Sequence, residues 1–63
     1  MKSNNILEQL AIDFMLKNNY HNREIEEYYV GGIKYFRVSF WIQGICYREF
    51  SGTFDVLINK LSN

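Results

Sequence analysis

Hydrophobic positions recur at helical spacing near both ends of the chain and at strand spacing between them. Residues 3–19 (SNNILEQLAIDFMLKNN) carry apolar side chains three and four positions apart, which predicts an amphipathic helix. Residues 53–61 (TFDVLINKL) repeat that spacing and predict a second, shorter helix. The apolar stripes are Ile6, Leu7, Leu10, Ala11 and Phe14 in the first helix, and Phe54, Leu57, Ile58 and Leu61 in the second.

Three strands joined by two tight turns are predicted between the helices. The strands are expected at residues 23–30, 33–42 and 45–50, which are rich in β-branched and aromatic residues. Gly31-Gly32 and Gln43-Gly44 separate them, and glycine supplies the positive φ that a two-residue hairpin turn requires. We therefore predict one domain, residues 1–63, of the α+β class. Its expected order is α-β-β-β-α, a three-stranded antiparallel meander with the helices packed on one face.

The predicted turns fix which residues lie opposite each other. Across Gly31-Gly32, Tyr28 is expected opposite Tyr35, and Glu26 opposite Arg37. The same reasoning across the second turn places Cys46 and Arg48 beside Trp41 and Ser39, on the same face of the sheet. The opposite face is the predicted core face, and it comprises Phe36, Val38, Phe40 and Ile42 with Ile25, Tyr29 and Tyr47.

One position conflicts with a regular third strand. Glu49 would point into the core in this register, so we expect a β-bulge that turns Phe50 inward instead.

The face opposite the predicted core is the candidate binding site. Aromatic and arginine side chains dominate binding hot spots, and together they would form a larger apolar patch than monomers usually expose. Two structural alternatives remain: the cross-strand pairs only stabilise the sheet, or the N-terminal helix covers this face. The candidate partner-binding residues are Tyr28, Tyr35, Arg37, Trp41 and Arg48, with Val30, Ile33 and Cys46 beside them.

Charge and hydropathy narrow the class of partner. Seven basic and seven acidic residues give a formal net charge of zero, whereas a dedicated nucleic-acid binder of this size is usually basic. Stacking aromatics near arginine can bind single strands, so nucleic acid stays the less favoured partner. The sequence has no apolar run long enough to span a membrane and no secretory signal, so we expect no membrane association and a cytoplasmic location.

The sequence offers little equipment for catalysis. Cys46 is the single cysteine and His21 the single histidine, which excludes an internal disulfide and an ordinary structural zinc site. No motif places a base beside Cys46 or an orienting partner beside His21. We therefore expect no enzymatic activity, no catalytic residues, no metal and no cofactor.

The run GIKYFRVSFWIQGICYREFSGTFDVL resembles the three-stranded DNA-binding domains of the AP2 type and of integrase N-termini. The resemblance covers residues 31–61 and rests on a hairpin pattern: a central strand of the form Y-R-V-x-F, a tight turn of the N-G type, a strand ending in phenylalanine, and a helix. It implies a sheet inserted into the major groove, with Arg37, Trp41 and Arg48 as contacts. Ile45 and Cys46 stand where these domains usually carry basic residues.

Taken together, these patterns predict a small non-enzymatic binding protein. Its size, lack of cysteine pairs and frequent Asn, Ile, Tyr and Lys suggest a phage or mobile element of an AT-rich bacterium. In that setting we expect it to inhibit or redirect a host protein in the host cytoplasm through the aromatic and arginine face. A homodimer through the same face, and an AP2-like DNA-binding accessory or transcriptional regulator, are the alternatives.

Overall fold

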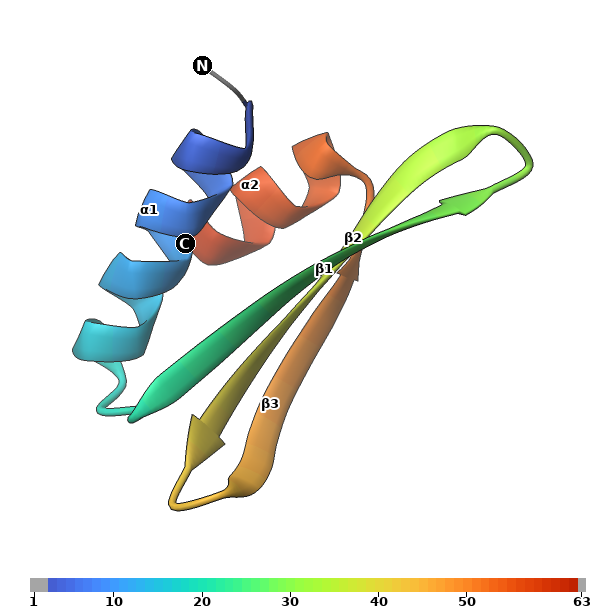
Figure 1. Cartoon of the computed structure of the whole chain (residues 1–63). Helices are drawn as coiled ribbons and strands as arrows, with labels where there is room; N and C mark the ends of the chain where they lie inside the picture. Colours follow the sequence, from blue (N-terminus) through green and yellow to red (C-terminus); the bar gives the residue numbers. More distant parts are fainter. Residues whose placement is uncertain (1–2, 63) are drawn as a thin grey trace.

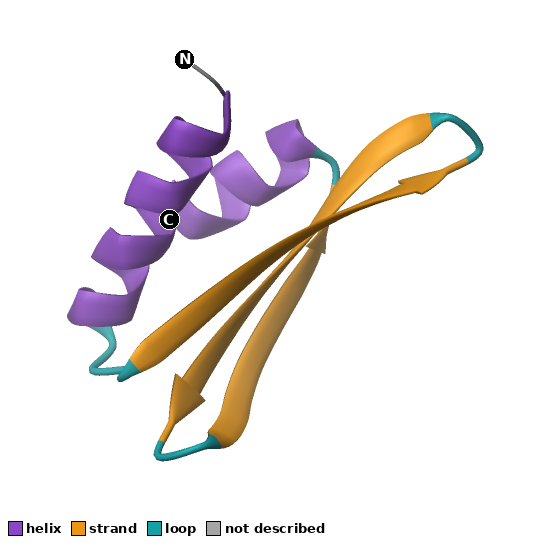
Figure 2. Ribbon diagram, in the orientation of Figure 1, coloured by secondary structure: helices purple, strands orange, loops and turns teal. Residues whose placement is uncertain are grey.

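The computed structural model describes residues 3–62 as two helices and a three-stranded antiparallel sheet (Figure 1). The elements follow the chain as α1 (Ser3–Lys17), β1 (Asn22–Val30), β2 (Ile33–Ile42), β3 (Ile45–Gly52) and α2 (Phe54–Ser62). The strand order is β1-β2-β3, so β2 is the central strand. Both helices lie on one face of the sheet (Figure 2), which confirms the predicted α+β meander.

The core lies between the helices and the inner face, which we define as the sheet face that carries Phe36, Val38 and Phe40. Those three side chains are at most 1% exposed, and each contributes about 1.5–3 kcal/mol by leaving water. The helices supply Leu7 and Ala11 from α1, and Leu57 and Leu61 from α2. The predicted stripes are confirmed except at Ile6, which is 56% exposed.

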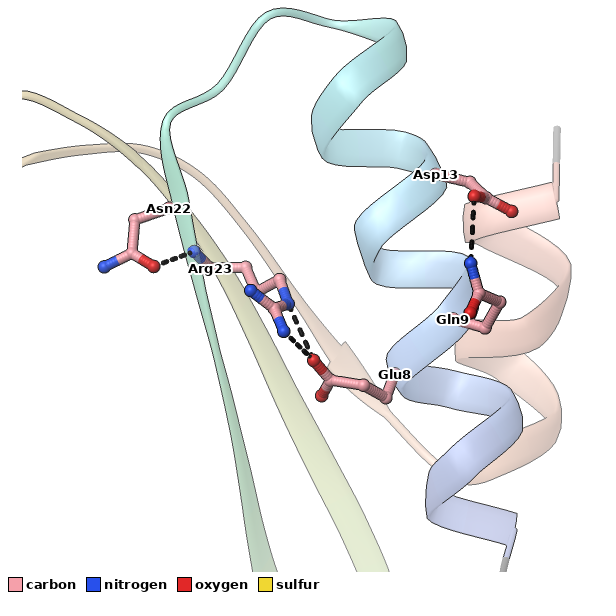
Figure 3. Close-up of polar contacts among 5 residues, drawn as sticks. All are labelled: Glu8, Gln9, Asp13, Asn22 and Arg23. Atoms are coloured by element: carbon pink, nitrogen blue, oxygen red, sulfur yellow. Dashed lines mark hydrogen bonds and ion pairs between the residues drawn. The ribbon is translucent and has the colours of Figure 1, made fainter.

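A polar contact also holds α1 against the inner face (Figure 3). The Arg23 guanidinium of β1 forms an ion pair with Glu8 of α1, and its Nε donates to Glu8 Oε2 at 2.7 Å. Asn22 Oδ1 accepts from the Arg23 backbone N–H at 2.9 Å. Because Arg23 pairs with Phe40 across the sheet, its side chain lies on the inner face and meets the helix there.

Both hairpin turns have the predicted conformation. Gly31 and Gly32 adopt φ values of 58° and 81°, and Gln43 and Gly44 adopt 49° and 81°. Two successive positive φ values define a type I′ turn, whose twist matches that of the flanking strands. In the first hairpin the predicted pairs of Tyr28 with Tyr35 and Glu26 with Arg37 are therefore confirmed.

The predicted bulge in β3 is also confirmed. Trp41 pairs with Cys46, but the preceding residue Phe40 pairs with Arg48, so Tyr47 is the extra residue. The shift turns Phe50 inward, where its ring meets that of Phe40 at 6.3 Å between centroids. It also moves Arg48 to the inner face, so the predicted position of Arg48 beside Ser39 was wrong.

Four residues of the predicted core face are not fully buried. Tyr29 is 66% exposed and Tyr47 is 59% exposed, while Ile25 and Ile42 are half-buried. β1 and β2 extend past the helices as a two-stranded ribbon (Figure 1), and the pairing of β2 with β3 starts only at Phe36. Tyr29 pairs with Lys34 in this two-stranded part. Tyr47 is the bulged residue. Alternation along a strand can therefore assign a residue to the inner face without that residue being buried.

Candidate functional site

The outer face, which is the sheet face opposite the helices, consists of five rows of residues paired across the strands. Starting from the second hairpin, the rows are Asn22, Trp41 and Cys46; Glu24, Ser39 and Glu49; Glu26, Arg37 and Ser51; Tyr28 and Tyr35; and Val30 and Ile33. The last two rows contain only two residues because β3 ends before them. We call the row of Glu24, Ser39 and Glu49 the acidic row, and the row of Tyr28 and Tyr35 the tyrosine row.

Neither helix covers the outer face. The buried side chains of α1 and α2 pack in one cluster with Phe36, Val38 and Phe40, all of which point to the inner face. The alternative in which the N-terminal helix covers the candidate site was therefore wrong.

The tyrosine row and Arg37 form one connected cluster. The rings of Tyr28 and Tyr35 stack with centroids 5.8 Å apart and planes 20° apart. The guanidinium of Arg37 lies 5.1 Å from the centre of the Tyr28 ring, a cation–π contact. Arg37 also donates from Nη1 to Glu26 Oε1 at 2.8 Å and forms an ion pair from Nε to Glu49 Oε2 at 3.1 Å.

These contacts determine the electrostatics of Arg37. The hydrogen bond to Glu26 is the largest effect and raises the pKa of the Arg37 guanidinium above its usual value. Desolvation lowers the pKa and the charges of Glu26 and Glu49 raise it, so the net shift is upward. Arg37 therefore stays charged, with its side chain fixed by three neighbours but still 41% exposed.

Trp41 lies on the outer face, but apart from this cluster. It is six residues from Tyr35 along β2, which corresponds to about 20 Å at 3.3 Å per residue. The indole is half-buried, and its Nε1 is buried without a hydrogen-bond partner among the described residues. Trp41 and the tyrosine row could therefore share a partner only if that partner spans most of the sheet.

Arg48 does not belong to the outer face at all. It pairs with Phe40, and its guanidinium lies 5.5 Å from the centre of the Phe50 ring. Lys60 of α2 lies over the same ring at 5.9 Å. Of the five predicted site residues, the structure brings together Tyr28, Tyr35 and Arg37, places Trp41 at a distance, and removes Arg48 to the other face.

Sequence reasoning missed one part of the outer face and placed another correctly. The first is the acidic row, where Glu24 and Glu49 lie on either side of Ser39, whose exposure is only 8%. The predicted bulge already implies that Glu49 points outward, so the sequence did contain a signal for the acidic row. The second is the pair of Val30 and Ile33, predicted beside the candidate residues and 55% and 54% exposed.

Metal-ligating side chains do not cluster within the described residues. No group of three His, Cys, Asp or Glu side chains lies close enough to hold a metal ion within this part of the chain. Cys46 and His21 are both exposed. A shallow open hollow is lined by Glu26, Glu27, Tyr28 and Arg37. Neither helix has the length and apolar character needed to cross a bilayer.

No protein-family model, curated protein or solved structure matches this chain. The class of the protein therefore rests on the fold and on the outer face themselves: a small α+β domain with one covered and one uncovered sheet face.

Proposed function

We propose that this chain is a small non-enzymatic binding protein that inhibits or redirects a host protein, and that it does so by contact through the outer face. The observation that carries the proposal is the uncovered cluster of the tyrosine row and Arg37. Tyrosine and arginine are among the residues that supply most binding energy in protein interfaces. A phage or mobile-element origin and action in the host cytoplasm remain part of the proposal.

The cluster is also held in place before any partner arrives. Tyr28 and Tyr35 stack on each other across a type I′ hairpin, and Arg37 is bound by two carboxylates. Binding through side chains that are already ordered loses less conformational entropy, so more of the contact energy remains as affinity. This geometry favours a role in recognition over a purely structural role for the pairs.

The dimensions of the domain suit an interface of ordinary size. The molecule extends 34 by 21 by 20 Å, and the sheet occupies one side of it. A standard interface takes about 800 Å² from each partner, which is comparable to the whole outer face. A partner would therefore cover all five rows rather than the tyrosine row alone.

The charges of the outer face favour a protein over DNA as the partner. Arg37 is already paired with Glu26 and Glu49, and Arg48 lies on the inner face. Nucleic-acid affinity depends largely on neutralising phosphates, which a face with more carboxylates than guanidiniums does poorly. The AP2-like alternative, which needs Arg37 and Arg48 on one face, therefore receives no support from this arrangement.

Affinity capture from native cells, with nuclease treatment, tests the proposal. The bait is the wild-type chain, compared with Tyr35→Ser on the outer face and Tyr29→Ser, a matched tyrosine that is 66% exposed on the inner face. We expect wild type and Tyr29→Ser to recover the same protein, and Tyr35→Ser to recover at least about thirtyfold less, as for a hot-spot residue. Circular dichroism checks that all three baits are folded. Equal recovery by Tyr35→Ser, or recovery that needs nucleic acid, would refute the proposal.

A further inference from the structure

The ionised side chains of the outer face are unequal in sign. Glu24, Glu26 and Glu49 face outward from the sheet, whereas Arg37 is the one basic residue in the five rows. Arg37 contacts Glu26 and Glu49, and no ion pair of Glu24 is found within residues 3–62. The acidic row is therefore only partly neutralised by the chain itself, although the whole sequence has no net charge.

Any partner that covers the outer face must also cover the acidic row. The row is the second of the five and lies between the row of Trp41 and the row of Arg37, so a partner that spans the outer face from Trp41 to Tyr35 crosses it. A carboxylate that loses water without gaining a positive partner is strongly destabilising in an interface. Glu49 shares Arg37 with Glu26, whereas Glu24 has no ion pair within residues 3–62, so covering the acidic row requires a cationic group from the partner.

We propose that the outer face binds a basic protein surface, one that places an apolar side chain against the tyrosine row and a lysine or arginine against the acidic row. The proposal rests on the proposed function and adds the chemistry of the partner. Ser39 in the acidic row and Tyr35 in the tyrosine row are four residues apart along β2, so the two contacts are separated by about 13 Å. Val30 and Ile33, both more than half exposed, extend the apolar contact to the end of the hairpin.

The same charges argue against the other occupants. In a face-to-face homodimer two acidic rows would enter one interface, and like charges there reduce affinity. Duplex DNA would bring phosphates to the same carboxylates. A basic protein surface is the occupant whose charge complements the face.

Selection of peptides from a displayed library of random 12-residue sequences tests the proposal directly. The immobilised targets are wild type, Tyr35→Ser, Glu24→Lys and Asp13→Lys. Asp13→Lys is the matched control, because Asp13 is exposed on α1 and its substitution changes the net charge as much as Glu24→Lys does. We expect wild type and Asp13→Lys to select peptides that combine Lys or Arg with an apolar residue. Glu24→Lys should bind those peptides at least about tenfold more weakly, and Tyr35→Ser should not retain them.

Each outcome of the selection decides a separate point. The proposal of a basic partner would be overturned if the peptides that depend on Tyr35 are neutral or acidic. It would also be overturned if those peptides bind Glu24→Lys as tightly as wild type. Either result would leave the proposed function standing. Absence of any peptide that depends on Tyr35 would overturn the proposed function as well. Two further results would overturn the proposed class of partner. One is sedimentation of wild type as a dimer while Tyr35→Ser sediments as a monomer. The other is binding of duplex DNA, measured by fluorescence anisotropy, that depends on Arg37.

Discussion

Gly52 is the last residue of β3, two residues before α2 begins. Replacing Gly52 with alanine tests this junction, where β3 ends short of the tyrosine row and the chain turns into the helix on the inner face. Gly52 has a φ of 154°, a conformation that side chains with a Cβ rarely adopt. A Cβ built at this position would lie 2.9 Å from Val56 Cγ1 and 3.2 Å from Val56 Cβ, in the first turns of α2. Gly52→Ala therefore adds backbone strain and a steric contact at the same place.

The two effects can be given separate magnitudes. An unfavourable φ/ψ held by its surroundings costs about 1–3 kcal/mol. Val56 is β-branched and on a helix, where one χ1 rotamer is strongly preferred, so moving it off that rotamer adds about 0.5–1.5 kcal/mol. The expected loss in unfolding free energy is about 2–4 kcal/mol, or a fall in Tm of about 10–25 °C for a domain of this size.

Urea and thermal unfolding, followed by circular dichroism and by the fluorescence of the single tryptophan, measure this loss. Gly44→Ala is the matched control, because Gly44 has a φ of 81° and nothing within 4 Å of its added Cβ. It should lose only the backbone part, about 1–2 kcal/mol. In a double-mutant cycle, Val56→Ala should recover about 1 kcal/mol of the Gly52→Ala loss by removing the steric contact.

The reasoning would be refuted by a Gly52→Ala variant that is no less stable than Gly44→Ala. It would also be refuted by a cycle in which Val56→Ala and Gly52→Ala are additive, since the steric contact would then contribute nothing.

Three further substitutions separate the core from the outer face. Phe40→Ala should lose about 3–5 kcal/mol and leave the chain largely unfolded by circular dichroism, because its side chain is fully buried; a loss below 2 kcal/mol would contradict the core. Trp41→Phe should change the unfolding free energy by less than about 1 kcal/mol, because it removes an indole N–H that is buried without a partner; a larger loss would show that the N–H is satisfied. Arg37→Gln should leave the pH dependence of urea unfolding unchanged between pH 7 and 10. The hydrogen bond to Glu26 raises the pKa of Arg37, so its contribution is complete below the unfolded pKa and is lost only as the pH rises through the raised value.

The sequence was sufficient for the topology and for the first hairpin. Two-residue turns with positive φ allow one register, and strict alternation then assigns each residue to a face. That is why the stacked pair of Tyr28 and Tyr35 and the pair of Glu26 with Arg37 could be placed before the structure was known. The inward turn of Phe50 was predictable for a related reason, since the alternative placed Glu49 in the core.

The errors arose where alternation alone cannot decide. A bulge shifts every later residue by one position, and Arg48 was assigned as if the bulge followed it rather than preceded it. Alternation along β1 assigns Tyr29 to the inner face, but Tyr29 is exposed because the helices do not extend over that part of the sheet. Trp41 was grouped with Tyr35 because the period of a strand gives the face of a residue and not its distance from other residues on that face.

The acidic row also explains why the helices cover only one of two largely aromatic faces. A helix that packed its apolar stripe on the outer face would bury Glu24, which has no ion pair within residues 3–62, and Glu49, which shares Arg37 with Glu26. Packing on the Phe36 and Phe40 face does not impose that cost. Packing on the inner face avoids that cost and leaves the tyrosine row in water. The proposed basic partner differs from the chain's own helices in this respect, because it would bring the positive charge that these carboxylates lack.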